Sequence, residues 1–302
     1  MSSTEAWSSV NDVESLNLRL PSPIVEIHDE LLTAREVRLF LKRDDLIHPD
    51  LNGNKWRKLK YNLEAAKLEA ASTLLTFGGA YSNHIRAVAA AGYYFDFKTI
   101  GIIRGEEHVP LNFSLAYAHD HGMLLKYMDR ATYRKKAEQQ ISSQLRAEFG
   151  DFYLIPEGGS NALAVRGCAE LTKEIEIDFD VICCSCGTGG TLAGISSALL
   201  YNQRALGFAI LKGAEFLNDD VANFQEAAFG HATSNWSIET GFHFGGYARK
   251  TGDLDEFISS FYSQHGVLLE WVYEAKMMYG LLKHVEQGKF DSGTTIVALI
   301  AG

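Results

Sequence analysis

The sequence predicts an α/β fold in which mostly parallel sheets are covered by helices on both faces. Three observations carry this prediction. Strand-type apolar runs alternate, along nearly the whole chain, with segments whose apolar residues recur at helical spacing. Several strand-to-helix junctions are rich in glycine, as they are in open α/β folds. The length of 302 residues is enough for about two domains.

In the first half of the chain, the clearest junction is an apolar run that stops at Gly78 and Gly79. Ser82 follows as the expected N-cap of a helix. We expect strands at 37–42, 73–77, 98–103, 124–128 and 151–155, and helices at 56–70, 82–91, 111–121 and 133–149.

The second half repeats this alternation, without an internal repeat or an obvious linker. We expect strands at 180–185, 209–214 and 295–300, and helices at 162–175, 192–201, 218–229, 254–265 and 272–286.

The chain is acidic, with a formal net charge of −10. A nucleic-acid-binding protein normally carries a basic face, so this class of function is not expected. One basic cluster nevertheless stands out, and it is either a solvated helix surface or an anion site, of which we expect the anion site. Its members are Lys42, Arg43, Lys55, Arg57, Lys58 and Lys60.

Neither secretion nor membrane insertion is expected. The first twenty residues contain three carboxylates and lack the apolar core of a signal peptide. No apolar run in the sequence is long enough to cross a bilayer.

The four cysteines are Cys168, Cys183, Cys184 and Cys186. The CxxC of Cys183 and Cys186 can indicate zinc or redox chemistry, but no second CxxC or paired histidine accompanies it. Alternation along a strand would also place these two cysteines on opposite faces. We therefore expect small buried hydrophobic residues, no metal site, and a reducing compartment, the cytoplasm.

A glycine loop, residues 187–191, lies directly between a predicted strand and a predicted helix. Glycines let the backbone approach an anion, and the loop N–H groups with the positive helix end supply donors. The loop is not a dinucleotide fingerprint, because Leu192 stands where the third glycine would be. It is not a P-loop either, since no Gly-Lys-Ser/Thr follows. Between a phosphate site and a plain tight turn, we expect the phosphate site.

Two further segments are ambiguous when each is taken alone. Ser82, Asn83 and His84 follow paired glycines, where Ser82 either only caps the helix or helps to present donors to a carboxylate. In the segment 52–58, Lys55 opens a helix, and the helix dipole with the neighbouring cations would lower its pKa. A lowered pKa is what a Schiff-base lysine needs, and exposed basic residues are the alternative.

In this order along an α/β chain, the segments resemble the fold type II pyridoxal-phosphate enzymes, the tryptophan synthase β-like group. Within that group they are most similar to the family of 1-aminocyclopropane-1-carboxylate deaminase and D-cysteine desulfhydrase. Gly-Asn-Lys-x-Arg-Lys together with Ser-Asn-His is specific for the family, whereas the glycine loop alone is not. The resemblance covers nearly the whole chain and rests on residues 42–45, 53–58, 79–84, 156–161, 187–191, 245–247 and 273–276.

The resemblance implies two domains, each with a mostly parallel sheet flanked by helices. Residues 1–56 and 160–302 would form a large cofactor-binding domain, and residues 57–159 a small domain. It also implies pyridoxal 5′-phosphate as cofactor, a small amino acid as substrate, and a homodimer.

The resemblance further implies roles for individual residues. Lys55 would hold the cofactor and move protons at the substrate Cα, and Glu274 would keep the pyridine nitrogen protonated. The phosphate would be held by Lys58 and by Gly187, Thr188, Gly189, Gly190 and Thr191.

On the substrate side, Asn83 would bond the pyridine 3′-oxygen and lie at the substrate, while Ser82 and His84 would meet the substrate carboxylate. Tyr247 and Tyr273 would join Lys55 and Ser82 as catalytic residues. Each tyrosine could instead be an ordinary core residue, and Glu274 could lie on the outer face of its helix.

The sequence departs from the family pattern near the C-terminus. Trp271 replaces the proline before Val-Tyr, and Ala275 replaces the glycine of Tyr-Glu-Gly-Lys. The chain finishes at Ile300-Ala301-Gly302 instead of His-Thr-Gly-Gly or His-Leu-Gly-Gly. Glu274 thus favours a deaminase, while the C-terminus supports neither activity.

We therefore expect a pyridoxal-phosphate-dependent deaminase or desulfhydrase, a lyase or hydrolase that yields a 2-oxo acid and ammonia. One alternative is a pyridoxal-phosphate carrier or sensor whose altered C-terminus has abolished turnover. A second alternative is a nucleotide-dependent enzyme that uses the glycine loop.

Overall fold

The computed structural model describes residues 16–51, 53–107 and 109–302. They divide into two compact units, which we call the large unit (residues 19–57 and 160–302) and the small unit (residues 58–159 with 16–18). Residues 1–15, most of the segment for which no signal peptide was expected, lie outside the described residues. So does Asn52 of the segment 52–58 around Lys55.

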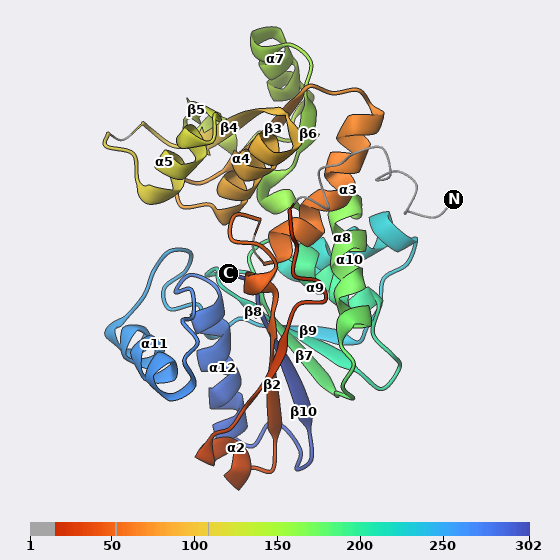
Figure 1. Ribbon diagram of the computed structural model, residues 1–302, viewed down its shortest axis with the longest axis vertical. Coiled ribbons are helices and arrows are strands. Elements are labelled where there is room, and N and C mark those ends of the chain that lie inside the picture. Colours follow the sequence, from red (N-terminus) through yellow and green to blue (C-terminus); the bar gives the residue numbers. More distant parts are fainter. Residues whose placement is uncertain (1–15, 52, 108) are drawn as a thin grey trace. The chain divides into compact units, whose positions relative to one another are not determined.

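The large unit is built on a sheet of six strands among the described residues, in the order β1-β2-β10-β7-β8-β9 (Figure 1). Every neighbouring pair is parallel except β1 and β2, which are antiparallel at one edge. The strands are β1 (Ile24–Ile27), β2 (Arg38–Arg43), β7 (Val181–Cys186), β8 (Arg204–Ala209), β9 (Trp236–Glu239) and β10 (Thr295–Ile300).

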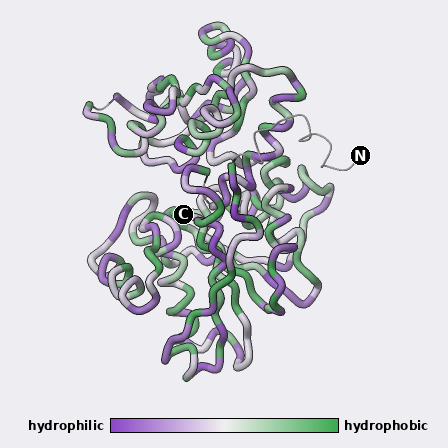
Figure 2. Tube along the Cα trace, in the orientation of Figure 1, coloured by the Kyte–Doolittle hydropathy of each residue, from purple (hydrophilic) through white to green (hydrophobic). Residues whose placement is uncertain are grey.

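Helices cover both faces of this sheet, and each face has its own hydrophobic cluster (Figure 1). One cluster packs α2, α11 and α12 against the sheet, and the other packs α8, α9 and α10. The central strands β7 and β10 are accordingly hydrophobic along their length (Figure 2). The helices are α2 (Glu30–Ala34), α8 (Ala162–Ala169), α9 (Gly190–Ser197), α10 (Leu217–Phe229), α11 (Gly252–His265) and α12 (Glu274–Glu286), with 3₁₀ turns η1 (Asp44–Leu46) and η3 (Glu170–Glu174).

The small unit contains a parallel sheet in the order β5-β4-β3-β6. Helix α4 packs on β3 and β4, while Ile141 and Leu145 of α7 join the cluster on the other face. Its elements are α3 (Asn54–Leu68, whose first residues belong to the large unit), β3 (Thr73–Gly78), α4 (Asn83–Phe95), β4 (Lys98–Arg104), α5 (Phe113–Asp120), β5 (Leu124–Met128), α6 (Arg130–Tyr133), α7 (Gln139–Phe149), β6 (Tyr153–Ile155) and the 3₁₀ turn η2 (Glu157–Gly159).

The predicted α/β class with mostly parallel sheets is confirmed, but several element positions were wrong. The strand expected at 209–214 lies at 204–209, because Gly207 interrupts the apolar pattern of the true strand. Gly207 is required there, since a Cβ would come within 2.6 Å of Cys186 Sγ. The helix expected at 133–149 spans only 139–149, as α7, because residues 134–138 form turns after the short α6 and Glu138 has an extended backbone.

Other differences concern ends and short elements. The helix expected at 162–175 ends as a 3₁₀ turn, and the helix expected at 192–201 spans 190–197. The short elements β1, α2 and β9 were not predicted, because four or five residues give too little periodicity.

The prediction that the cysteines are small buried residues is confirmed. All four cysteines are buried free thiols. Cys183 belongs to one hydrophobic cluster of the sheet and Cys186 to the other, so the two lie on opposite faces. Among the described residues, no group of side chains could hold a metal ion, and no helix has the length and apolar character needed to span a bilayer.

Candidate active site

The carboxyl edge of the large sheet gathers three of the predicted segments: the glycine loop, the Lys55 segment and the start of α12. Parallel pairing aligns the last residues of the strands, with Cys186 opposite Ala209 and Ile300 opposite Arg43. The glycine loop directly follows β7, and Lys55 follows β2. Helix α12 leads into β10, and its first residue, Glu274, accepts a hydrogen bond from the backbone N–H of Ala301 just beyond that strand. Ligands of open α/β sheets bind at this edge.

Lys55 is linked to the glycine loop through one amide side chain. Its Nζ donates to Asn54 Oδ1 over 2.7 Å, and Asn54 Nδ2 donates to Thr191 Oγ1 over 2.9 Å. The preceding Gly53 has a φ of 60°, and a Cβ there would lie 1.2 Å from the carbonyl oxygen of Ala301. Only glycine fits this position, which explains the glycine before Asn-Lys.

The glycine loop ends as the N-terminus of α9. Gly189 is the N-cap residue in the left-handed region, with a φ of 78°, and α9 begins at Gly190. The first N–H groups of a helix have no partner within the helix, so they are available to an anion. The Thr188 hydroxyl is held by Ser160 Oγ at 2.6 Å. This geometry fits a phosphate site better than a turn that only reverses the chain.

Tyr273 lies against the glycine loop. A Cβ on Gly187 would come within 3.2 Å of Tyr273 Cε1. The rings of Tyr247 and Tyr273 are 6.3 Å apart between centroids and inclined by 74°. Burial raises the pKa of Tyr273 well above its usual value, and Tyr247 raises it further. At neutral pH, Tyr273 is therefore a protonated phenol that can donate a proton.

Glu274 is a buried carboxyl group with 1% exposure, and so does not lie on the outer face of α12. Its Oε1 accepts from Ala301 N over 3.3 Å, while its Oε2 is buried and has no hydrogen-bond partner among the described residues. Burial and, after it, the nearby Glu270 carboxylate raise the pKa of Glu274 to about 8, against the opposing effect of Lys55. Such a carboxyl group exchanges its proton near neutral pH.

Three residues at this edge escaped the sequence-based prediction. Glu270 accepts hydrogen bonds from Val272 N and Tyr273 N, each between 2.9 and 3.0 Å, and so fixes the backbone before α12. The others are Asn54 and Lys276, which stood inside recognised motifs without an assigned role. Glu270 lies next to the atypical Trp271, and nothing in the sequence marks it.

The small unit holds the other predicted site residues. Ser82 is the N-cap of α4 and accepts from Ile85 N over 3.3 Å, which confirms the predicted cap. Asn83 is the first residue of that helix. Lys58 is buried, and its Nζ donates to the carbonyl oxygen of Gly158 over 3.1 Å.

His84 is buried in the small unit with 2% exposure. The Thr76 hydroxyl donates to Ile155 O, so His84 Nε2, 2.8 Å from that hydroxyl, must be the donor between them. The ring also lies against Gly159, where a Cβ would come within 3.0 Å of His84 Cε1. His84 therefore supports the turn at Gly159.

The predicted anion site of the basic cluster is wrong for Lys42 and Arg57, and Arg43 is likewise paired with a carboxylate, that of Asp45, at 2.7–2.8 Å. Lys42 and Arg57 are buried and bind carboxylates instead of a ligand. Arg57 contacts both oxygens of Asp44 and both of Glu174 at 2.6–2.8 Å, and Lys42 Nζ lies 3.0 Å from Glu174. Although burial opposes it, the hydrogen bonds and charges of Arg57 and Lys42 lower the pKa of Glu174 to about 2. The sequence could not show these partners, because Glu174 is more than a hundred residues away.

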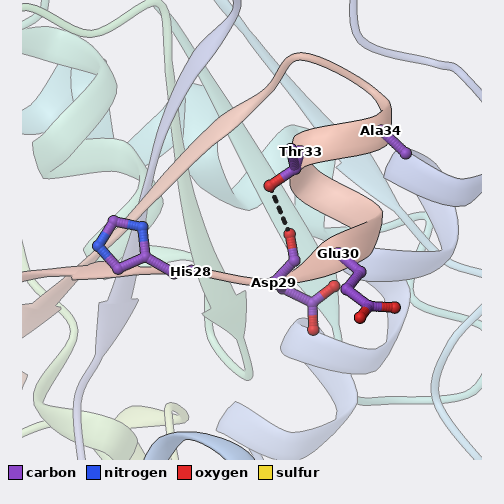
Figure 3. A pocket seen from close by; sticks show the side chains of 5 residues that line it. All are labelled: His28, Asp29, Glu30, Thr33 and Ala34. Carbon is purple, nitrogen blue, oxygen red and sulfur yellow. Dashed lines mark hydrogen bonds between the residues drawn. The ribbon is translucent and has the colours of Figure 1, made fainter.

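A surface hollow of about 490 Å³ lies elsewhere in the large unit, at the start of α2 (Figure 3). Its polar groups already serve the helix: Asp29 Oδ1 accepts from Leu31 N over 2.7 Å, and Thr33 Oγ1 donates to the Asp29 carbonyl over 3.0 Å. None of the predicted site residues lines it, so we assign no ligand to this hollow.

The residues at the carboxyl edge fit pyridoxal phosphate. The open Oε2 of buried Glu274 suits a pyridine nitrogen, which a carboxyl group can protonate. The N-terminus of α9 after left-handed Gly189 suits a phosphate dianion. Lys55 lies near enough to influence the titration of Glu270 and Glu274, so its amine belongs to the same constellation.

Comparisons with known proteins agree with this geometry. The model of the family described as pyridoxal-phosphate dependent enzyme matches residues 17–302. A bifunctional D-cysteine desulfhydrase/1-aminocyclopropane-1-carboxylate deaminase of Arabidopsis thaliana is 31% identical over 273 residues, 82% of this chain and 67% of that protein. A D-cysteine desulfhydrase of Salmonella choleraesuis is 26% identical over 87% of this chain and 86% of its own.

Among solved structures, an ACC deaminase homologue superposes with a TM-score of 0.84 and 27% identity, covering 95% of this chain and 90% of that one. A threonine deaminase of Solanum lycopersicum shares the fold, with a TM-score of 0.69 and 17% identity over 100% of this chain and 85% of its own. The resemblance seen in the motifs is thus confirmed: the chain belongs to the family of pyridoxal-phosphate dependent enzymes.

Proposed function

We propose that this enzyme converts a small amino acid, 1-aminocyclopropane-1-carboxylate or D-cysteine, to a 2-oxo acid and ammonia. The observation that carries the proposal is the buried Glu274, whose Oε2 has no hydrogen-bond partner among the described residues. Glu274 directly follows Tyr273 in the chain, and the Tyr273 ring contacts the glycine loop. The names of two relatives, a D-cysteine desulfhydrase and a bifunctional desulfhydrase/deaminase, support the same two substrates.

Pyridoxal phosphate, when bound, supplies an electron sink for the electrons of a bond broken at the substrate Cα. We propose that residues 1–56 and 160–302 form the domain that binds it, with residues 57–159 as the small domain. Lys55 would hold it covalently and Glu274 would hold a proton at the pyridine nitrogen. Its remaining atoms would be held by Lys58, Asn83, Gly187, Thr188, Gly189, Gly190 and Thr191.

Side chains of the enzyme would carry out the proton transfers, and the two substrates would need different ones. With D-cysteine, the Lys55 amine would take the proton from Cα before sulfide leaves. The cyclopropane acid has no hydrogen on Cα, so ring opening needs an acid that gives a proton to a ring carbon. Tyr273 is the candidate for that task, because its ring lies against the glycine loop and beside Tyr247, and a phenol is protonated at neutral pH.

Ser82 and Tyr247 would complete the substrate side, Ser82 as an alternative proton donor or as a ligand of the carboxylate. Ser82 is partly exposed and its Oγ accepts from Ile85 N, so its O–H can donate to another group. For Asn83 and His84 we retain the predicted role at the substrate. In addition, the contact of His84 with the Gly159 turn would help to fix the position of the α4 N-terminus.

By the resemblance to the family motifs, Glu274 favours the deaminase reaction over sulfide release. The test is a panel of D- and L-amino acids with the cyclopropane acid, scored for ammonia and 2-oxo acid. The proposal expects turnover of the cyclopropane acid, of D-cysteine, or of both. Turnover confined to L-amino acids would overturn the substrate assignment.

A carrier or sensor without turnover is not favoured, because binding alone requires neither the buried Glu274 nor the paired Tyr247 and Tyr273 at the glycine loop, and the named relatives are enzymes. We also propose a cytoplasmic homodimer, which four buried free thiols support as far as a reducing compartment is concerned. Sedimentation of the purified protein at twice the chain mass would support the dimer, and sedimentation at the chain mass of 33.4 kDa would exclude it.

A further inference from the structure

Lys276 is a buried ammonium group on α12 to which the proposed chemistry gives no task. The residue is 1% exposed. Its Nζ donates to the carbonyl oxygen of His243 over 3.0 Å and to that of Gly246 over 2.8 Å. A buried ammonium is costly unless it is hydrogen-bonded, and both acceptors belong to the short segment around Tyr247. The side chain thus ties that segment to α12.

The tied segment, residues 243–248, which we call the Tyr247 loop, has a strained backbone. Phe244 and Ala248 have φ angles of 52° and 50°, although both carry side chains. Gly245 and Gly246 between them have φ angles of 92° and 114°. Such conformations persist only where surrounding groups determine them. The two bonds from Lys276 reach the first and the fourth residue of the loop and so span most of this strained stretch.

The charge of Lys276 is compatible with this role. Burial lowers the pKa of Lys276 to about 8, and the nearby Glu270 carboxylate opposes the shift. The side chain is therefore mostly an ammonium ion at neutral pH, with enough donors for both carbonyl oxygens.

The loop ends beside a second functional group on the same helix turn. Gly246 directly precedes Tyr247, whose ring centroid is 6.3 Å from that of Tyr273. Tyr273 precedes Lys276 by three residues, a spacing that places both near one face of the start of α12. A shift of the loop would therefore change the spacing of the two phenols.

We propose that Lys276 is a positioning residue, which holds the carbonyl groups of His243 and Gly246 and thereby fixes Tyr247 against Tyr273. This inference rests on the proposed function, which places both tyrosines at the substrate. Lys276 itself does not touch the reacting atoms. It acts through the conformation of the Tyr247 loop.

The first test needs no cofactor. Hydrogen–deuterium exchange of the Lys276→Met chain should rise about tenfold or more in peptides that cover residues 243–249, because the strained loop loses the two hydrogen bonds from Lys276. Peptides that cover the glycine loop should exchange as in the parent. Lys283→Met is the matched control: Lys283 lies on the same helix but is exposed and pairs with Glu286, so its removal should leave both regions unchanged. Unchanged exchange of residues 243–249 in Lys276→Met would overturn the proposal.

The second test is a double-mutant cycle on the loaded enzyme. Lys276→Met should lower kcat by about 10- to 100-fold, the loss typical of a misplaced catalytic group, with cofactor retained. Because Lys276 acts through Tyr247, Lys276→Met combined with Tyr247→Phe should be no slower than the slower single variant. Losses that multiply would show that the two residues act independently and would overturn the proposal.

A second variant and the exchange measurement separate failure of this proposal from misfolding and from failure of the proposed function. Lys276→Gln, which retains one donor group, should give exchange between those of the parent and Lys276→Met, and it replaces the methionine variant if that chain does not fold. A parent that turns over none of the tested amino acids would contradict the proposed function, while the exchange measurement would still decide whether Lys276 holds the loop.

Discussion

The ring of Tyr273 lies against the backbone of Gly187, so closely that a Cβ on Gly187 would come within 3.2 Å of Tyr273 Cε1. Gly187 does not have a positive φ, so the ring, and not the backbone conformation, is what a side chain here would crowd. This contact joins the loop assigned to the phosphate with the residue assigned to the substrate. Gly187 therefore lies where the proposed phosphate site and the proposed substrate side meet.

Removal of the Lys55 amine should abolish turnover. Lys55→Ala takes away the group that would hold the cofactor and move protons at Cα, so the cofactor should be bound at most loosely. Borohydride reduction of the parent, followed by peptide mapping, should place the cofactor mass on the peptide that contains Lys55. Label on any other lysine contradicts the assignment.

An acidic side chain in the glycine loop should severely weaken cofactor binding. Gly189→Asp adds a negative charge where a phosphate dianion must approach, and its Cβ would lie 2.8 Å from Val221 Cγ2. Equilibrium dialysis against pyridoxal phosphate measures the effect. Gly230→Asp is the matched control, because Gly230 also has a φ of 78° but has open space around its Cβ. If both variants bind the cofactor like the parent, the loop is only a turn.

The buried ion cluster at the start of α3 should matter for stability. Arg57→Met leaves Asp44, which is fully buried, without its bidentate partner. Loss of one partner of a buried pair costs about 3–5 kcal/mol of the free energy of unfolding. Urea unfolding measures this loss, and Arg38→Met, which breaks an exposed pair with Glu26, should cause little change. Equal effects of the two substitutions would mean that the buried cluster is not important for folding.

The sequence predicted those parts of the site that depend on local order. The strand-to-helix junctions at Gly79 and at the glycine loop were visible because glycines and the N-cap Ser82 stand beside apolar runs. Parallel alternation then implied that the loops after β2 and β7 share one edge of a sheet, which the strand register bears out.

What the sequence could not show are partners brought together from distant segments. The basic cluster was expected at an anion because the carboxylate of Glu174, which takes up two of its cations, is over a hundred residues away. Lys276 gave no sign of its acceptors, because these are backbone carbonyl groups of a loop that has no pattern of its own. Short strands such as β9 also escaped, since four residues carry too little periodicity.

The buried carboxyl group of Glu274 should make the stability of the cofactor-free chain depend on pH. Its pKa is about 8 in the folded chain against an ordinary value of 4.5, so folding favours the protonated form. The contribution is complete below about pH 4.5 and is lost as the pH rises through about 8, a change on the order of a few kcal/mol. Relative to Glu274→Gln, the parent should therefore become less stable between pH 5 and pH 8.

Chemical unfolding of both chains at a series of pH values measures that difference. Other titrating groups, Lys276 among them, are common to the two chains and largely cancel in the comparison. Stability curves that run parallel from pH 5 to pH 8 would mean that Glu274 is ionised in the folded chain.

Glu274 should also control the rate of the reaction. Glu274→Gln keeps the shape and the hydrogen bond from Ala301 N but cannot hold a proton at the pyridine nitrogen. The cofactor should stay bound, since Lys55 and the glycine loop are untouched. Turnover should fall by about ten- to ten-thousand-fold, the range for the loss of one positioned acid–base or electrostatic partner. Glu286→Gln, at the exposed far end of the same helix, should leave the rate unchanged.

Steady-state rates on the substrate that the panel identifies, with cofactor content measured in each variant, test this prediction. Equal rates for Glu274→Gln and the parent would remove Glu274 from the ring nitrogen, and with it the preference for the deaminase reaction.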